Sequence, residues 1–138
     1  MTRWFCCTAA ALLIAAAPLR AEDADPPIDC AKASATFELN YCADQDLAQA
    51  DKALNAAYEE ALAKVKKGAG GEPYDAKAWE AKLRASQRAW IAFRDAECKE
   101  LAPMSWSGGT GTTGAVLGCM SSITKQRTKD LDEQFGEQ

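Results

Sequence analysis

Polar side chains that could do chemistry gather in two stretches of the sequence, residues 51–58 and 87–98. Their carboxylates and guanidinium groups could act as general acids and bases, or as ion pairs that hold helices together. Catalytic carboxylate pairs need environments that separate their pKa values, and a nucleophile needs an adjacent base. The chain contains no histidine, and most of its carboxylates are expected on solvated helix faces. We therefore predict no enzyme but a polar layer, in which Asp51 pairs with Arg94 or Arg88. Its members are Asp51, Asn55, Tyr58, Gln87, Trp90, Arg94 and Asp95.

Two other motifs suggest ligands but lack the context that those ligands require. Residues 109–114 read GTGTTG, which matches the dinucleotide fingerprint, but no strand precedes them to place the turn. The Asp-x-Asp sequence at 44–46 lacks the rest of a calcium loop. Without histidine, and with cysteines expected in disulfides, a transition-metal site is also disfavoured. We expect no cofactor and no metal.

The N-terminus predicts export. A basic start is followed by an apolar run over residues 4–18 and by the small residue Ala21. This pattern is typical of a secretory signal peptide, here residues 1–21, and the run is short for a membrane span. Residues 22–29, with Pro26 and Pro27, predict a flexible leader before a domain at 30–135. We expect a periplasmic or secreted protein with no stable membrane anchor after cleavage.

Charge narrows the class of partner. Removal of residues 1–21 takes away Arg3 and Arg20 and no acidic residue, which leaves 14 basic and 20 acidic side chains. A net charge near −6 disfavours nucleic acid and anionic membranes and favours a basic protein.

Helical patterns cover most of the remaining chain. Apolar residues recur at three- and four-residue steps from Ser34 to Lys67, from about residue 75 to Leu101, and from Ala115 to Phe135. Asp44 could interrupt the first of these helices. Glycines at 68–71 and Pro73 separate the first two, which predicts an antiparallel helical hairpin followed by a C-terminal helix. The fold class is all-α, and an irregular loop is expected at 103–114.

Four cysteines remain after the signal peptide, which predicts two disulfides in an exported domain. They are Cys30, Cys42, Cys98 and Cys119. In the hairpin register Cys42 lies level with Cys98, which favours that pair together with Cys30–Cys119. The rival pairing, Cys30–Cys42 with Cys98–Cys119, would require a chain reversal near Asp44.

These residues, taken in order, resemble the LprI-type lysozyme inhibitor domain over roughly residues 29–131. The resemblance rests on D-x-x-L-N-x-x-Y at 51–58, Q-R-x-W-x-x-x-R-D-x-x-C at 87–98, and T-x-x-R-x-x-x-L at 124–131 after Cys119. It implies an α-helical, disulfide-held periplasmic or envelope protein, some of whose relatives inhibit lysozyme. Ala35 stands where a hydroxyl residue often caps the first helix.

Lysozymes of the hen type are basic and have a carboxylate-lined cleft, so an acidic partner would be steered towards them. The loop at 103–114 is the predicted binding element, with Met104 and Trp106 as anchors and Gly108 and Gly109 allowing close backbone approach. Alternatively, Trp106 folds back onto the hairpin and caps its core. The alternative function is a structural or stress-related envelope domain that binds another periplasmic protein or peptidoglycan without inhibiting lysozyme.

Overall fold

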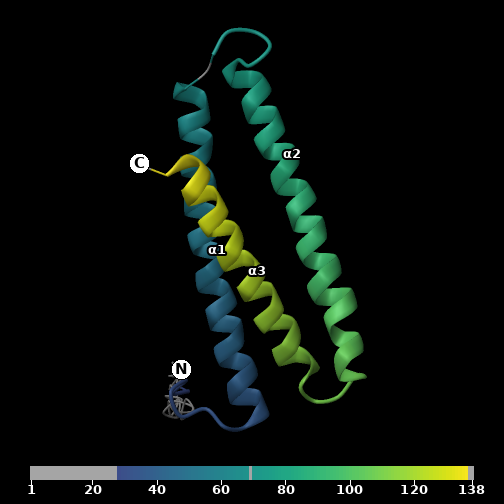
Figure 1. Ribbon diagram of the computed structural model, residues 1–138. Helices are drawn as coiled ribbons and strands as arrows, with labels where there is room; N and C mark the ends of the chain where they lie inside the picture. Colours follow the sequence, from purple (N-terminus) through teal and green to yellow (C-terminus); the bar gives the residue numbers. More distant parts are fainter. Residues whose placement is uncertain (1–27, 69, 137–138) are drawn as a thin grey trace, which may run out of the picture.

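A computed structural model describes residues 28–68 and 70–136, which form three long α-helices and two short helical segments (Figure 1). The helices are α1 (Thr36–Lys67), α2 (Ala76–Asp95) and α3 (Thr112–Phe135). Between α2 and α3 lie η1 (Ala96–Leu101), a π-helical turn, and η2 (Ala102–Trp106), a 3-10 helix. The described residues contain no strand, and the all-α prediction is confirmed.

Helix α1 begins without a hydroxyl cap. Ala35 occupies the N-cap position, and the carboxylate of Glu38 accepts hydrogen bonds from the backbone N–H groups of Ser34 and Ala35, both at 2.9 Å. These two bonds lower the pKa of Glu38. The helix continues through Asp44 without a break and ends at Gly68 after three lysines in its last turn.

The three helices pack as a hairpin with a third helix laid along it (Figure 1). Helices α1 and α2 run antiparallel, and α3 runs parallel to α1 and contacts both. Helix α1 supplies most of the buried side chains, several of them alanines that let α3 approach closely. One apolar cluster contains Leu54, Ala57, Ala61, Leu62, Val65, Leu83 and Leu131; a second contains Leu47, Cys98 and Met120.

The predicted second helix is interrupted after Asp95. The chain widens into η1 and then tightens into η2, in which Pro103 lies at the start and contributes no backbone N–H. Cys98 lies in the wider turn and is completely buried. Helix α3 starts at Thr112 rather than Ala115, so the irregular segment is shorter than predicted.

The predicted disulfide pairing, Cys42–Cys98 with Cys30–Cys119, is wrong. The structure contains Cys30–Cys42 and Cys98–Cys119, with Cα–Cα distances of 5.6 and 5.5 Å. Helix α3 passes beside η1 and brings Cys119 to Cys98.

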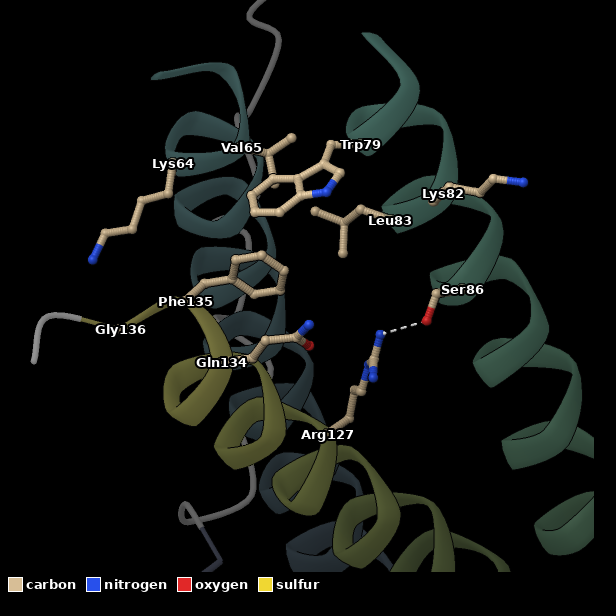
Figure 2. Close-up of a pocket in the computed structure, with 10 residues that line it drawn as sticks. All are labelled: Lys64, Val65, Trp79, Lys82, Leu83, Ser86, Arg127, Gln134, Phe135 and Gly136. Carbon is tan, nitrogen blue, oxygen red and sulfur yellow. Dashed lines mark hydrogen bonds between the residues drawn. The ribbon is translucent and has the colours of Figure 1, made fainter. Parts of the chain in front are cut away.

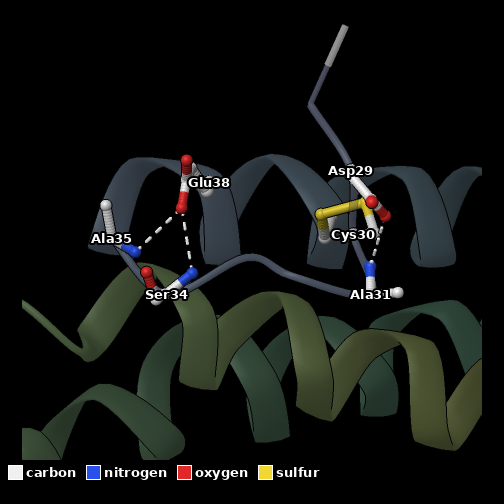
Figure 3. Close-up of a disulfide and its surroundings, with 7 residues drawn as sticks. Asp29, Cys30, Ala31, Ser34, Ala35 and Glu38 are labelled. Atoms are coloured by element: carbon white, nitrogen blue, oxygen red, sulfur yellow. Dashed lines mark hydrogen bonds between the residues drawn. A yellow bond between two sulfur atoms is a disulfide. The ribbon is translucent and has the colours of Figure 1, made fainter.

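The chain reversal required by the pair Cys30–Cys42 lies before α1, not near Asp44. Asp29 accepts hydrogen bonds from Ala31 N–H through its side chain and from Lys32 N–H through its carbonyl. This turn returns Cys30 to the first turns of α1 (Figure 3).

The predicted signal peptide, residues 1–21, and most of the predicted leader lie outside the described residues. Among the helices of the described part, none is long and apolar enough to cross a membrane.

Candidate partner-binding surface

One arginine joins all three helices through the predicted polar layer. Arg94 of α2 donates from Nη1 to Asp51 Oδ1 of α1 at 3.1 Å and to Thr124 Oγ1 of α3 at 3.2 Å. Its Nε donates to Asp95 Oδ1 at 3.3 Å, and its guanidinium lies 5.1 Å from the centre of the Trp90 ring. The Arg94 side chain is only 13% exposed, and Thr124 is fully buried. With these protein partners, Arg94 holds the three helices together.

Among the described residues, the other predicted members of this layer, Asn55, Tyr58 and Gln87, form no side-chain hydrogen bond with one another. Gln87 accepts a hydrogen bond from Arg127 Nε of α3 at 3.2 Å. Tyr58 is half-buried against the larger apolar cluster, and Asn55 lies exposed on α1. Arg127 was a motif residue in the resemblance, and its role in this second contact between α2 and α3 was missed.

Sequence reasoning also missed a cluster between α1 and α3. Ser121 Oγ donates to Asp46 Oδ2 at 2.6 Å, and Lys125 Nζ donates to both carboxylate oxygens, at 2.7 and 2.6 Å. The hydrogen bond from Lys125, followed by that from Ser121, lowers the pKa of Asp46. The four-residue spacing of Ser121 and Lys125 on one face of α3 was the available signal.

A third lowered pKa belongs to Asp95, whose carboxylate accepts a hydrogen bond from Lys99 Nζ at 2.8 Å and a weaker one from Arg94. Throughout the described segments, no group of three or more histidine, cysteine or acidic side chains is arranged to hold a metal ion. Asp46 thus joins α1 to α3, whereas the contacts of Asp95 lie within one helical stretch.

The segment that carries the predicted anchors is ordered by its own backbone. Ser107 and Gly108 adopt left-handed conformations, with φ of 48° and 72°. Gly109 N–H donates to the Trp106 carbonyl at 2.9 Å, and Thr112 N–H donates to the Gly109 carbonyl at 3.0 Å. The connection between η2 and α3 is a tight turn of five residues, which replaces the predicted twelve-residue loop.

Trp106 is partly packed against its own turn and partly exposed. The six-membered part of its ring packs on Gly111 so closely that a Cβ at that position would overlap the ring. The ring also lines a shallow depression with Leu39 and Asn40 of α1. The Trp106 side chain nevertheless remains 51% exposed, and Met104 is 74% exposed.

Two further exposed apolar side chains belong to the same end of the bundle. Leu39 shares the depression with Trp106, and Leu101 lies one helical turn before Met104. Their exposed fractions are 50% and 58%. We call Leu39, Leu101, Met104 and Trp106 the apolar end surface. It lies at the end of the bundle that also holds both disulfides.

Comparisons with known proteins point to one family. A family model described as "Lysozyme inhibitor LprI" matches residues 29–131. An uncharacterised protein of Rhizobium meliloti (strain 1021) is 40% identical over 126 residues, which cover 88% of each chain. No solved structure matches the chain significantly.

Proposed function

Because the chain belongs to the lysozyme inhibitor LprI family, we propose that it is an exported, non-enzymatic protein that binds lysozyme and occludes its cleft. The observation that carries the proposal beyond the family is the apolar end surface, with Met104 and Trp106 as its anchors. Tryptophan is enriched among residues that dominate binding energy, and methionine adapts to irregular partner surfaces.

The geometry of Trp106 favours binding. Its ring is held against Gly111, and the following turn is closed by backbone hydrogen bonds. A side chain that is already ordered loses less conformational entropy when a partner covers its free face. The exposed face of Trp106 is thus suited to insertion between the walls of a cleft.

Acidic residues near the apolar end surface also favour a lysozyme as the partner. Glu97 and Glu100 lie in η1, the same short segment as Leu101. Lys99, the basic residue between them, donates a hydrogen bond to Asp95. Acidic groups around an apolar centre favour approach to a basic protein and speed association at low ionic strength. A hen-type lysozyme, basic and with an acidic cleft, fits this description.

The test is inhibition of lysozyme acting on bacterial cell walls, followed by turbidity. The protein is secreted with its own N-terminal segment, purified from the periplasm and titrated at low and at physiological salt. We expect stoichiometric inhibition that weakens as salt screens the charges. Trp106→Ala should weaken inhibition by about thirtyfold or more, since loss of a hot-spot residue costs about 2 kcal/mol or more.

Two further variants sharpen the test. Gly111→Ala keeps both Met104 and Trp106. It should nevertheless weaken inhibition, because the new Cβ displaces the Trp106 ring. Tyr74→Ala is the matched control, since Tyr74 is 69% exposed and precedes α2 at the opposite end of the bundle. Equal inhibition by folded Trp106→Ala and Tyr74→Ala would exclude the apolar end surface as the binding element. If neither hen-type nor goose-type lysozyme is inhibited, an envelope domain that binds another periplasmic protein or peptidoglycan becomes the better account.

A further inference from the structure

A groove opens between the three helices at the end of the bundle away from the apolar end surface (Figure 2). Its volume is about 810 Å³, which lies in the size range of small-molecule binding sites. Helix α1 contributes Val65, α2 contributes Trp79, Leu83 and Ser86, and α3 contributes Arg127 and Phe135.

One half of the groove is apolar. Val65 and Leu83 form its floor and are only 1% and 7% exposed. The rings of Trp79 and Phe135 extend into the space from α2 and α3 (Figure 2). Trp79 is 45% exposed, so much of its ring remains available to an apolar ligand.

The other half of the groove carries a cation without an acidic partner. Arg127 donates from Nε to Gln87 Oε1 and from Nη2 to Ser86 Oγ, both at 3.2 Å, and both acceptors are neutral. Within the described ranges, no carboxylate oxygen lies within 4.0 Å of its guanidinium nitrogens. A guanidinium has five N–H donors, so most of its donors remain for an anion.

The neighbouring lysines do not present their charges to an anion inside the groove. Lys64 and Lys82 also line the groove, but their ammonium groups point away from it (Figure 2). Lys64 in addition forms an ion pair with Glu60 at 3.5 Å. Arg127 is therefore the group to which an anion inside the groove would bind.

We propose that this groove binds a small amphiphile that has one carboxylate and one unbranched apolar chain. The carboxylate pairs with Arg127, and the chain lies between Trp79 and Phe135 over Leu83. Charge complementarity identifies the headgroup, and the adjoining apolar half identifies the tail. The site is separate from the apolar end surface and does not depend on lysozyme inhibition.

The first experiment is calorimetric titration of the secreted, purified protein with octanoate, nonanoate and decanoate below their micelle concentrations. We expect one site per chain, with affinity rising about fourfold per added methylene as more apolar surface is buried. Octanamide, which has the same chain but no charge, should bind about tenfold more weakly than octanoate because it loses the charge-assisted bonds to Arg127.

Variants test which half of the groove binds the carboxylate and which binds the apolar chain. Arg127→Gln should weaken octanoate binding about tenfold and octanamide binding much less, because only octanoate loses an ion pair. Ser86→Asp places a carboxylate beside Arg127 from an exposed position, and it should have the same effect if Arg127→Gln fails to fold. Trp79→Ala should weaken both ligands, and Arg88→Gln is the control because Arg88 is exposed on α2 and does not line the groove.

Three outcomes would overturn the proposal. The first is absence of octanoate and decanoate binding, and the second is equal binding of octanoate and octanamide. The third is a concentration-dependent dimer in sedimentation that Trp79→Ala dissociates, because the groove would then be covered by a second copy of the chain.

Discussion

Arg94 should be the most costly charged side chain to remove from this bundle. We consider Arg94→Met, which keeps much of the apolar stem and removes the guanidinium. The lost bond to the fully buried Thr124 is worth about 1.5–3 kcal/mol, because the donor is charged and the remaining hydroxyl cannot reach water. The cation–π contact with Trp90 adds about 0.5–1 kcal/mol.

The ion pair with Asp51 contributes less, because the Asp51 side chain is 45% exposed. Water solvates its carboxylate after the change, so we assign no more than about 1 kcal/mol to this pair. Together these contributions predict a loss of about 3 kcal/mol for Arg94→Met. Asp51→Asn should cost no more than about 1 kcal/mol.

The assay is urea unfolding followed by circular dichroism, with both disulfides intact and the slope of the transition compared between variants. Arg88→Met is the matched control because Arg88 is exposed on the same helix, and it should change the free energy of unfolding by less than about 0.5 kcal/mol. A double-mutant cycle with Thr124→Val should give a coupling of about 1 kcal/mol or more. An Arg94→Met protein as stable as the Arg88→Met protein would refute the role given to the polar layer.

Three further predictions concern the bridges, the pH dependence and the N-terminus. Replacing Cys98 and Cys119 together by alanine should lower the free energy of unfolding by about 3 kcal/mol or more, measured in urea; Cys98 is fully buried, so its loss also weakens packing. The hydrogen bond from Lys125 lowers the pKa of Asp46 in the folded protein. The ionised Asp46 carboxylate therefore contributes to the free energy of unfolding above pH 3.8, and this contribution is lost as pH falls through the folded pKa. The destabilisation caused by Asp46→Asn should therefore be largest near neutral pH and shrink in unfolding titrations below pH 3.8. Mass spectrometry of the exported protein should find Glu22 as its first residue, and retention of residues 1–21 would contradict a cleaved signal peptide.

Local patterns in the sequence were sufficient to identify the three long helices, but not the interruption after Asp95 or the start of α3 at Thr112. The apolar stripe from Leu39 to Val65 and the glycines after Lys67 predicted α1 and its end, because periodicity and helix termination are local properties. The register of the hairpin likewise placed Asp51 near Arg94, and the two side chains form an ion pair at 3.1 Å.

The pairing of the cysteines could not be predicted from local sequence patterns. Cys42 and Cys98 do lie towards the same end of the bundle, but the path of α3 decides which sulfur each one meets. That path depends on packing of all three helices, and register between two of them cannot reveal it. The turn at Asp29, which pairs Cys30 with Cys42, depends on two hydrogen bonds in a segment without periodicity.

The candidate sites show the same division between local and tertiary information. Met104 and Trp106 stood out because large apolar residues in a Gly- and Ser-rich segment are unusual. Contact of the Trp106 ring with Gly111 could not be predicted, since it requires the left-handed turn at Ser107 and Gly108. Arg127 was visible as a motif residue, but its position in a groove appears only when α2 and α3 are placed together.

The two ends of the bundle differ in how strongly they are restrained, and this difference bears on function. Both disulfides, the Glu38 cap and the turn after Trp106 lie at one end, where the chain would otherwise fray. Restraints of this kind order a binding surface before a partner arrives, which lowers the entropic cost of association. At the opposite end a groove opens between the three helices, and no disulfide of the described chain crosses it. A rigid end suits recognition of a preformed protein cleft, and an open end between helices suits a small ligand that fills the space between them.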